Sequence, residues 1–209
     1  MKRSLLLVFS VLLIMVLAAC GGNEEEKPNK DNNQENEESS ETMADQNKSD
    51  STDKEDVLVS LKNKDGDVVA TATLTEDEEG VHVALEGEKL PAGTHGFHIH
   101  EKGACEAPDF KSAGGHFNPT DAKHGFDVPE GPHAGDMKNI EVGEDGTVQT
   151  ERLADMVTLK KGEANSLFKE GGTALVIHSG ADDYKSQPSG DAGERIACGV
   201  IGEYINEAG

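Results

Sequence analysis

The chain has 209 residues, of which 41 are acidic and 19 are Lys or Arg, so its formal net charge is −22. This balance argues against nucleic-acid binding, because phosphates select Lys and Arg. The sequence has no GxGxxG or Walker-type phosphate loop and no internal repeat, which excludes the commonest nucleotide-binding motifs.

The chain begins with a pattern typical of a signal peptide. Lys2 and Arg3 precede an apolar run of 15 residues, Leu5–Ala19. A membrane-spanning helix needs roughly 20 residues, so the alternative of an uncleaved signal anchor fits less well. The run ends in LAAC, which resembles the lipobox of bacterial lipoproteins and implies cleavage before Cys20 and lipidation (palmitate) of its thiol. We therefore predict a lipoprotein signal peptide over 1–19 and a lipid anchor on the extracytoplasmic face of the cell membrane.

The following segment is too polar to build a core. Residues 21–56 contain 13 acidic residues and 4 lysines, a net charge of −9, and their apolar side chains are Met43 and Ala44. Low hydrophobicity with high net charge predicts disorder. A flexible chain of this length spans roughly 30–36 Å, which suits a tether between a domain and a membrane. We predict a lipidated cysteine with a disordered acidic linker over 20–56; a functional acidic tail is the alternative.

Residues 57–209 are long enough for one domain, with 13 basic and 28 acidic residues and a net charge of −15. Alternating apolar and polar residues, separated by turn residues, predict several short strands. The predicted segments are 57–63, 68–75, 81–87, 94–100, a hairpin over 139–153, 173–179 and 195–204. A helical pattern is possible only over 162–171. Many short strands and few helices indicate an all-β antiparallel sandwich or barrel.

A Gly-, Pro- and His-rich stretch, 102–137, interrupts the strands and holds three of the eight histidines. Irregular stretches of this length are usually functional or disordered. His98 and His100 lie just before it in a strand pattern, so their side chains point to the same face. Imidazole suits zinc and copper, and a carboxylate such as Asp136 can complete a tetrahedral zinc site. Each piece alone is a weak signal, but together they predict a metal site.

The cysteines carry a second structural prediction. If Cys20 is lipidated, Cys105 and Cys198 remain as a pair, and a secreted protein favours a disulfide between them. Such a bridge would stabilise the fold by roughly 4–5 kcal/mol in the chain-entropy model. Two unpaired buried thiols are the alternative.

Taken in order, the motifs GFHIH, GGHFNP, KHG, PHAGD, LVIHSGADD and GERIACGVIG resemble the copper/zinc superoxide dismutase family. The resemblance covers residues 57–204, nearly the whole predicted domain. It implies an eight-stranded Greek-key β-barrel with long metal-binding loops, and copper and zinc as cofactors.

The resemblance also assigns ligands to seven positions, all of which carry metal-competent side chains. The implied copper ligands are His98, His100, His116 and His178. The implied zinc ligands are His116, His124, His133 and Asp136. His116 would therefore bridge the two metals.

Other positions match supporting residues of the family. Asp182 matches a carboxylate that links a copper-ligand histidine to a zinc-ligand histidine. The pair Cys105 and Cys198 matches the family disulfide, and Arg195 matches the arginine that attracts the anionic substrate. Of the two remaining histidines, we expect a supporting role for His95 and a surface or structural role for His82.

The implied activity is dismutation of superoxide to dioxygen and hydrogen peroxide by alternate reduction and reoxidation of copper, with His116 and Arg195 as catalytic residues. The segment between His178 and Arg195 is shorter than in animal members, and only Lys185 remains there as a candidate guiding charge. Glu194 and Asp191 would weaken the attraction of an anion if they lay near the arginine.

Two other classes of protein are possible. A copper- or zinc-binding surface lipoprotein with little turnover would use the same ligands without catalysis. A purely structural adhesion sandwich does not explain seven metal-competent residues in this order. The sequence does not decide between a monomer and a homodimer.

Overall fold

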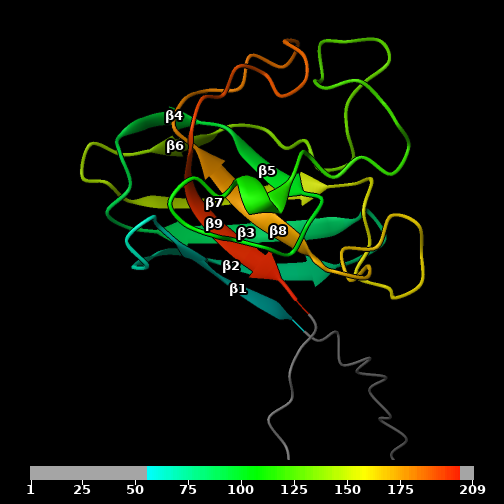
Figure 1. The fold of residues 1–209 in the computed structure, drawn as a ribbon, viewed down its shortest axis with the longest axis horizontal. Coiled ribbons are helices and arrows are strands. Elements are labelled where there is room, and N and C mark those ends of the chain that lie inside the picture. The colour runs from blue at the N-terminus through cyan, green and yellow to red at the C-terminus, as the bar shows by residue number, and fades with distance from the viewer. Residues whose placement is uncertain (1–55, 203–209) are drawn as a thin grey trace, which may run out of the picture. The chain divides into compact units, whose positions relative to one another are not determined.

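The structure is a computed structural model, and it describes residues 56–202 (Figure 1). The predicted signal peptide, Cys20 and the linker up to residue 55 lie outside the described residues. Within 56–202, no helix is long and apolar enough to cross a membrane.

The described residues form nine strands and one short 3₁₀ helix, η1, at Lys111–Ala113. The strands are β1 Val57–Lys62, β2 Val68–Glu76, β3 Val81–Gly87, β4 Gly93–His95, β5 Phe97–His100, β6 Ile140–Val142, β7 Val148–Ala154, β8 Thr173–His178 and β9 Arg195–Ile201. All paired strands run antiparallel. The prediction of an all-β antiparallel fold is confirmed.

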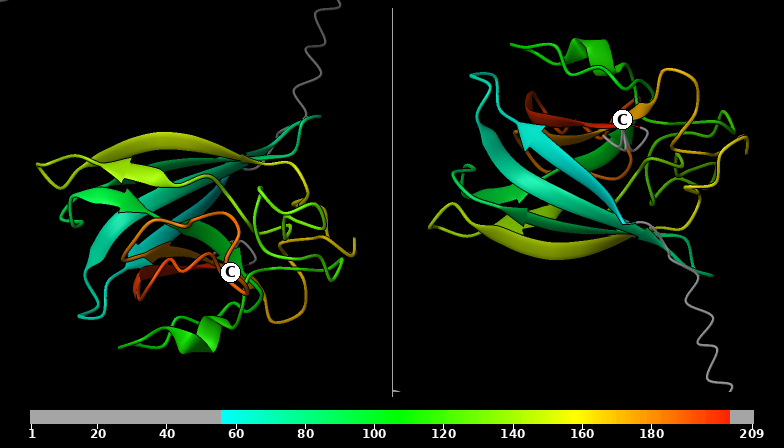
Figure 2. Two further views of the ribbon diagram at one scale, coloured as in Figure 1. Left: turned by 90° about the horizontal axis from the view of Figure 1, so that it is seen from above. Right: turned by 90° about the horizontal axis from the view of Figure 1, so that it is seen from below.

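Seven strands form one sheet, in the order β5-β8-β9-β1-β2-β3-β7, and β4 pairs with β6 in a second ladder. The large sheet curls into a half-barrel, as the two views of Figure 2 show. Part of the long connection after β5 and the connection between β8 and β9 lie on the same upper side of the domain in Figure 1. This arrangement brings segments far apart in the sequence to one side of the sheet.

Alternation along the strands builds the core. On β1, Val57, Val59 and Leu61 are buried, whereas the residues between them are exposed, and β3 repeats the pattern with its own apolar residues. Fully burying one such side chain contributes about 1.5–3 kcal/mol.

Strands β5 and β8 depart from this alternation, because every one of their residues is buried. Phe97 and Ile99 belong to the main core, so the alternating His98 and His100 point to the opposite face of the sheet. That outer face is covered by the connections after β5 and β8, not by solvent. The candidate site is built on this outer face of β5 and β8, which carries histidines and is closed by loops.

The prediction of one continuous strand over 94–100 was wrong. This segment is divided at Gly96 into β4 and β5, which belong to different sheets. Gly96 donates a hydrogen bond to the carbonyl of Gly180 and accepts one from the His178 amide, both at 2.8 Å. A Cβ atom at this position would lie 2.9 Å from the Cβ of Ala192, so only glycine allows the later loop to approach so closely. This break explains why the described residues contain nine strands where eight were expected.

Two other sequence predictions were wrong in detail. The turn of the 139–153 hairpin is present, but β6 pairs with β4 and β7 pairs with β3. The possible helix over 162–171 is absent and is replaced by turns. The predicted strand from 195 ends at Ile201, and residues 203–209 lie outside the described part of the chain.

Candidate metal centre

The long connection after β5 returns to lie against that strand. The amide of Ile99 donates to the carbonyl of Gly135, and the amide of Phe117 donates to the carbonyl of Ile99, both at 2.8 Å. A Cβ atom on Gly135 would clash with the Ile99 oxygen, so glycine is required for this approach. The pairing places His116 and Asp136 directly beside β5.

Seven buried side chains converge there into two groups that share one member. Within each group, the potential ligand atoms lie within 4.8 Å of one another. The first group, the copper quartet, is His98, His100, His116 and His178. The second group, the zinc quartet, is His116, His124, His133 and Asp136. The structure therefore brings together all seven predicted ligands, with His116 in both quartets.

The chemistry of the donor atoms fits metal ions. Four buried ring nitrogens have no hydrogen-bond partner: His98 Nδ1, His116 Nε2, His124 Nδ1 and His133 Nδ1. The last two lie 3.0 and 3.2 Å from oxygens of Asp136, but they are too poorly aligned with them for hydrogen bonds. Buried polar atoms without a partner are costly, and coordination of a cation would satisfy them. Neutral imidazole is a good ligand for copper and zinc.

Asp182 orients one histidine of each quartet. Its carboxylate oxygens lie 2.8 Å from His98 Nε2 and 3.0 Å from His124 Nε2, and its side chain is fully buried. In each ring, the other nitrogen is one of the unpartnered atoms. Hydrogen bonding of the outer nitrogen fixes the tautomer and the direction of a metal-binding histidine, so Asp182 couples the two quartets.

Backbone carbonyls orient two further copper-quartet histidines. His100 Nδ1 lies 3.0 Å from the Gly114 oxygen, and His178 Nδ1 lies 3.5 Å from the Gly193 oxygen. The opposite nitrogens, His100 Nε2 and His178 Nε2, face each other at 3.3 Å.

Arg195 lies at the start of β9, beside the copper quartet. Its guanidinium donates hydrogen bonds of 2.6 Å to the carbonyls of Phe110 and Gly114. The Gly114 oxygen also accepts from His100, so one carbonyl group sets the positions of both side chains. A fixed positive charge therefore lies next to four potential copper ligands.

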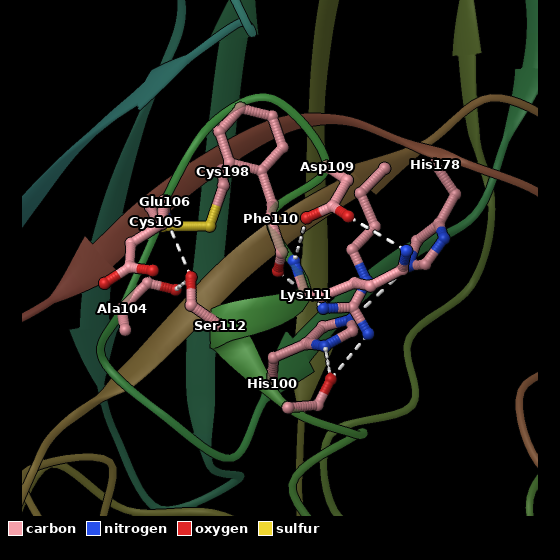
Figure 3. Close-up of a disulfide and its surroundings, with 12 residues drawn as sticks. His100, Ala104, Cys105, Glu106, Asp109, Phe110, Lys111, Ser112, His178 and Cys198 are labelled. Atoms are coloured by element: carbon pink, nitrogen blue, oxygen red, sulfur yellow. Dashed lines mark hydrogen bonds and ion pairs between the residues drawn. A yellow bond between two sulfur atoms is a disulfide. The ribbon is translucent and has the colours of Figure 1, made fainter.

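A disulfide holds the loop that supplies these carbonyls. Cys105 and Cys198 are bonded, with their Cα atoms 5.6 Å apart, which confirms the predicted pairing. Ser112 reinforces the loop, because its hydroxyl donates to the Ala104 carbonyl and accepts from the Glu106 amide (Figure 3).

Comparison with known proteins agrees with this geometry. Residues 66–201 match the family model described as copper/zinc superoxide dismutase (SODC). The chain belongs to the copper/zinc superoxide dismutase family. The resemblance seen in the sequence is thus confirmed, and the chain is an oxidoreductase of a family that uses copper and zinc.

Individual dismutases and dismutase-like proteins are similar over most of their length. "Superoxide dismutase [Cu-Zn] 2" of Aquifex aeolicus is 60% identical over 142 residues, which cover 68% of this chain and 83% of that protein. "Superoxide dismutase-like protein YojM" of Bacillus subtilis is 46% identical over 145 residues, covering 68% of this chain and 74% of that protein. A crystal structure of a SOD-like protein from Bacillus subtilis aligns with a TM-score of 0.67 at 45% identity, over 69% of this chain and 97% of that chain.

Burial keeps two copper-quartet histidines of this dismutase-family chain neutral, His116 and His178. Burial and the nearby His98 lower the pKa of His116 to about 4, against the opposing effect of Asp136. Burial and the nearby His98 and His116 lower the pKa of His178 to about 2. At neutral pH these rings therefore offer lone pairs to a metal.

His124 in the zinc quartet behaves differently. Burial lowers its pKa, but the carboxylates of Asp136 and Asp182 on its two sides outweigh burial and raise the pKa to about 9. The same interactions act on Asp136 in the opposite direction. Burial raises the pKa of its carboxyl, but interactions with the surrounding histidines outweigh burial and hold that pKa well below the ordinary value.

Zinc uptake should therefore release a proton. At pH 7 the His124 ring of the metal-free protein is protonated, because its pKa is about 9, and zinc binds only the deprotonated ring. We expect about one proton per zinc, and an apparent zinc affinity that increases from pH 7 towards pH 9. Calorimetric titration in buffers of different ionisation enthalpy measures the proton count. Asp182→Asn should lower the count, and zinc binding at pH 7 without proton release would contradict the prediction.

The remaining sequence predictions are placed as follows. His95 has its ring nitrogens 2.8 Å from the carbonyl oxygens of His178 and Pro91, so it supports the backbone beside a candidate copper ligand. His82 lies at the surface between Asp77 and Glu151, at 3.1 and 3.2 Å.

An acidic residue of the disulfide loop acts on Arg195. Burial lowers the pKa of Arg195, and the carboxylate that opposes this shift belongs to Asp109 in the disulfide loop. Asp191 and Glu194 are exposed, as is Lys185. Sequence reasoning missed Asp109, because it considered only acidic residues close to Arg195 along the chain.

Proposed function

We propose that this protein dismutates superoxide to dioxygen and hydrogen peroxide on the outer side of a bacterial membrane, held there by a lipid on Cys20. One observation carries the catalytic part of the proposal. Two complete donor groups share His116, and Arg195 lies beside the group suited to copper.

When bound, copper would supply one-electron reduction and reoxidation, and zinc would supply a fixed charge on the shared imidazole. The chain's own residues supply the rest. Arg195 attracts the superoxide anion and fixes its orientation by its positive charge. His116 Nε2 is buried without a partner and can hold the proton that the peroxide product needs. Asp182 keeps His98 and His124 in the tautomers that direct their free nitrogens inward.

One relative carries the name "superoxide dismutase-like". Turnover is favoured over simple metal binding by the complete donor set together with the arginine. A metal-storage site has no need of a cation held by two carbonyls at the copper quartet.

The test is superoxide removal by the full chain loaded with copper and zinc, with its metal content measured. We expect activity well above that of the same concentration of free copper. Bound copper and zinc with no activity above free copper would instead establish a metal-binding lipoprotein.

The location rests on the sequence. The apolar run Leu5–Ala19, the LAAC motif and the acidic segment 21–56 together support a lipidated cysteine with a polar tether. A tether of roughly 30–36 Å would hold the domain in the solvent, where it meets superoxide that arises outside the cell.

Cys20→Ser should release the protein from the membrane or leave its signal peptide uncleaved, because the thiol that would carry the lipid is gone. Fractionation and metabolic labelling with a fatty-acid analogue measure both effects. Cys105→Ala serves as the control, since Cys105 lies in the domain, and it should remain labelled. A Cys20→Ser chain that is processed and membrane-bound as before would contradict lipidation.

A further inference from the structure

Tyr184, in the connection between β8 and β9, fastens that connection to the loop that carries the zinc-quartet residues. Its hydroxyl accepts a hydrogen bond of 2.9 Å from the Asn139 amide. Its carbonyl accepts one of 3.1 Å from the Asp127 amide. Its own amide donates one of 2.6 Å to the Asp182 carboxylate. One residue therefore contacts three segments of the chain through three different polar groups.

The ring of Tyr184 is also held by two neighbouring side chains, Phe126 and Lys138. It meets Phe126 edge to face, with ring centroids 5.7 Å apart at 72°. The Lys138 ammonium lies 3.9 Å from the Phe126 centroid and 4.6 Å from the Tyr184 centroid. Edge-to-face aromatic pairs and ammonium groups over aromatic rings are both attractive, so the three side chains stabilise one arrangement of the two loops.

The backbone at this contact is strained. Tyr184 has a φ of 62°, in the left-handed region that bulky residues rarely adopt. A Cβ atom on the facing Gly125 would clash with the Tyr184 oxygen, so glycine is required there. Such a conformation persists only where its surroundings enforce it, and it is most frequent at functional sites.

The contacts of Tyr184 lead directly to Asp182. The Asn139 amide group pairs with the Asp182 backbone, donating to its carbonyl at 2.9 Å and accepting from its amide at 3.0 Å. The side-chain hydroxyl of Tyr184 holds the backbone amide of Asn139, and the backbone amide of Tyr184 donates to the side-chain carboxylate of Asp182. The Asp182 carboxylate in turn contacts His98 and His124, one from each quartet.

We propose that Tyr184 is a positioning residue for Asp182, and that through it Tyr184 holds His98 and His124 in the geometry that both metals require before either metal binds. The side-chain partners of Tyr184 described above, Asn139, Phe126 and Lys138, are not among the seven candidate ligands. The inference rests on the copper and zinc assignment of the proposed function, but it does not depend on turnover.

The experiment compares metal binding by the full chain and by three variants, Tyr184→Ala, Tyr184→Phe and Lys185→Ala. Zinc affinity is measured by competition with a chromophoric chelator, cobalt in the zinc quartet by its visible absorption, and copper by electron paramagnetic resonance. Lys185→Ala is the matched control, since Lys185 is the exposed neighbour of Tyr184 and its amide bonds only to Asp183.

We expect Tyr184→Ala to weaken zinc binding by about tenfold and to change the copper spectrum, because loss of an outer contact disorders Asp182 on both sides. Tyr184→Phe keeps the ring and loses one hydrogen bond, so we expect a loss of about threefold. Lys185→Ala should bind both metals as the unaltered chain does. A change at copper separates positioning from a general loss of stability, which would lower the melting temperature without altering the spectrum.

Unchanged zinc affinity and copper spectrum in Tyr184→Ala would overturn the inference, as would weaker zinc binding with an unaltered copper spectrum. If Tyr184→Ala fails to fold, Tyr184→Phe decides by the same measurements. If the unaltered chain bound neither metal, the proposed function would fail and the inference with it. Tight binding by the unaltered chain and by the variants alike overturns the inference alone.

Discussion

Replacing His178 with alanine should abolish superoxide removal while zinc remains bound. His178 belongs to the copper quartet and is absent from the zinc quartet. Loss of a residue that only orients a ligand already costs 10–100-fold in metal affinity or activity, so loss of a ligand should lower activity by at least about 100-fold. The backbone around position 178 should persist, because its amide bonds to Gly96 and its carbonyl is held by His95.

The measurement is dismutase activity per chain, together with bound copper and zinc determined by mass spectrometry. His82→Ala is the control, since it removes a histidine that lies outside both candidate quartets. Full activity in His178→Ala would show that copper, if it acts at all, acts elsewhere. Equal loss of both metals would show that the two quartets do not function as separate sites.

The seven donors followed from the resemblance to the family's motifs, which could be read because histidine and aspartate carry their chemistry in the side chain. His98 and His100 alternate on a strand, so their common face followed from local geometry alone. Apart from His178 at the end of β8, the other ligands lie on irregular backbone, where periodicity gives no information. Their convergence depends on the pairing of the loop with Ile99 through Gly135, a contact between main-chain atoms that leaves no pattern except the glycine itself.

The strands too were predicted correctly where local periodicity decides the structure and wrongly where a distant segment does. Predictions held where one face is buried and the other exposed, as on β1, but the single strand over 94–100 was wrong because Gly96 lets a distant loop approach. Asp109 and Tyr184 were missed for a related reason. Each acts on a residue that only tertiary structure brings near it, Arg195 for the first and Asn139 for the second.

Removal of the disulfide should lower both stability and activity. The bond joins residues 93 positions apart, and a closed loop of this length stabilises a fold by about 4–5 kcal/mol in the chain-entropy model. We therefore expect the double variant Cys105→Ala/Cys198→Ala to lose about that much free energy of unfolding, measured by guanidinium titration of the metal-loaded chain. Incubation of the unaltered chain with a reductant should produce a similar loss.

Activity should fall for a separate reason. The disulfide restrains the loop whose Phe110 and Gly114 carbonyls hold the Arg195 guanidinium, and Gly114 also holds His100. Once the loop is released, the positive charge no longer has one fixed position, and misplacement by about 1 Å can cost up to about 100-fold in rate. Arg195→Gln should reproduce the loss of activity with a much smaller loss of stability, because the disulfide remains. A double cysteine variant that keeps full activity would show that the loop holds Arg195 in place without its covalent link to β9.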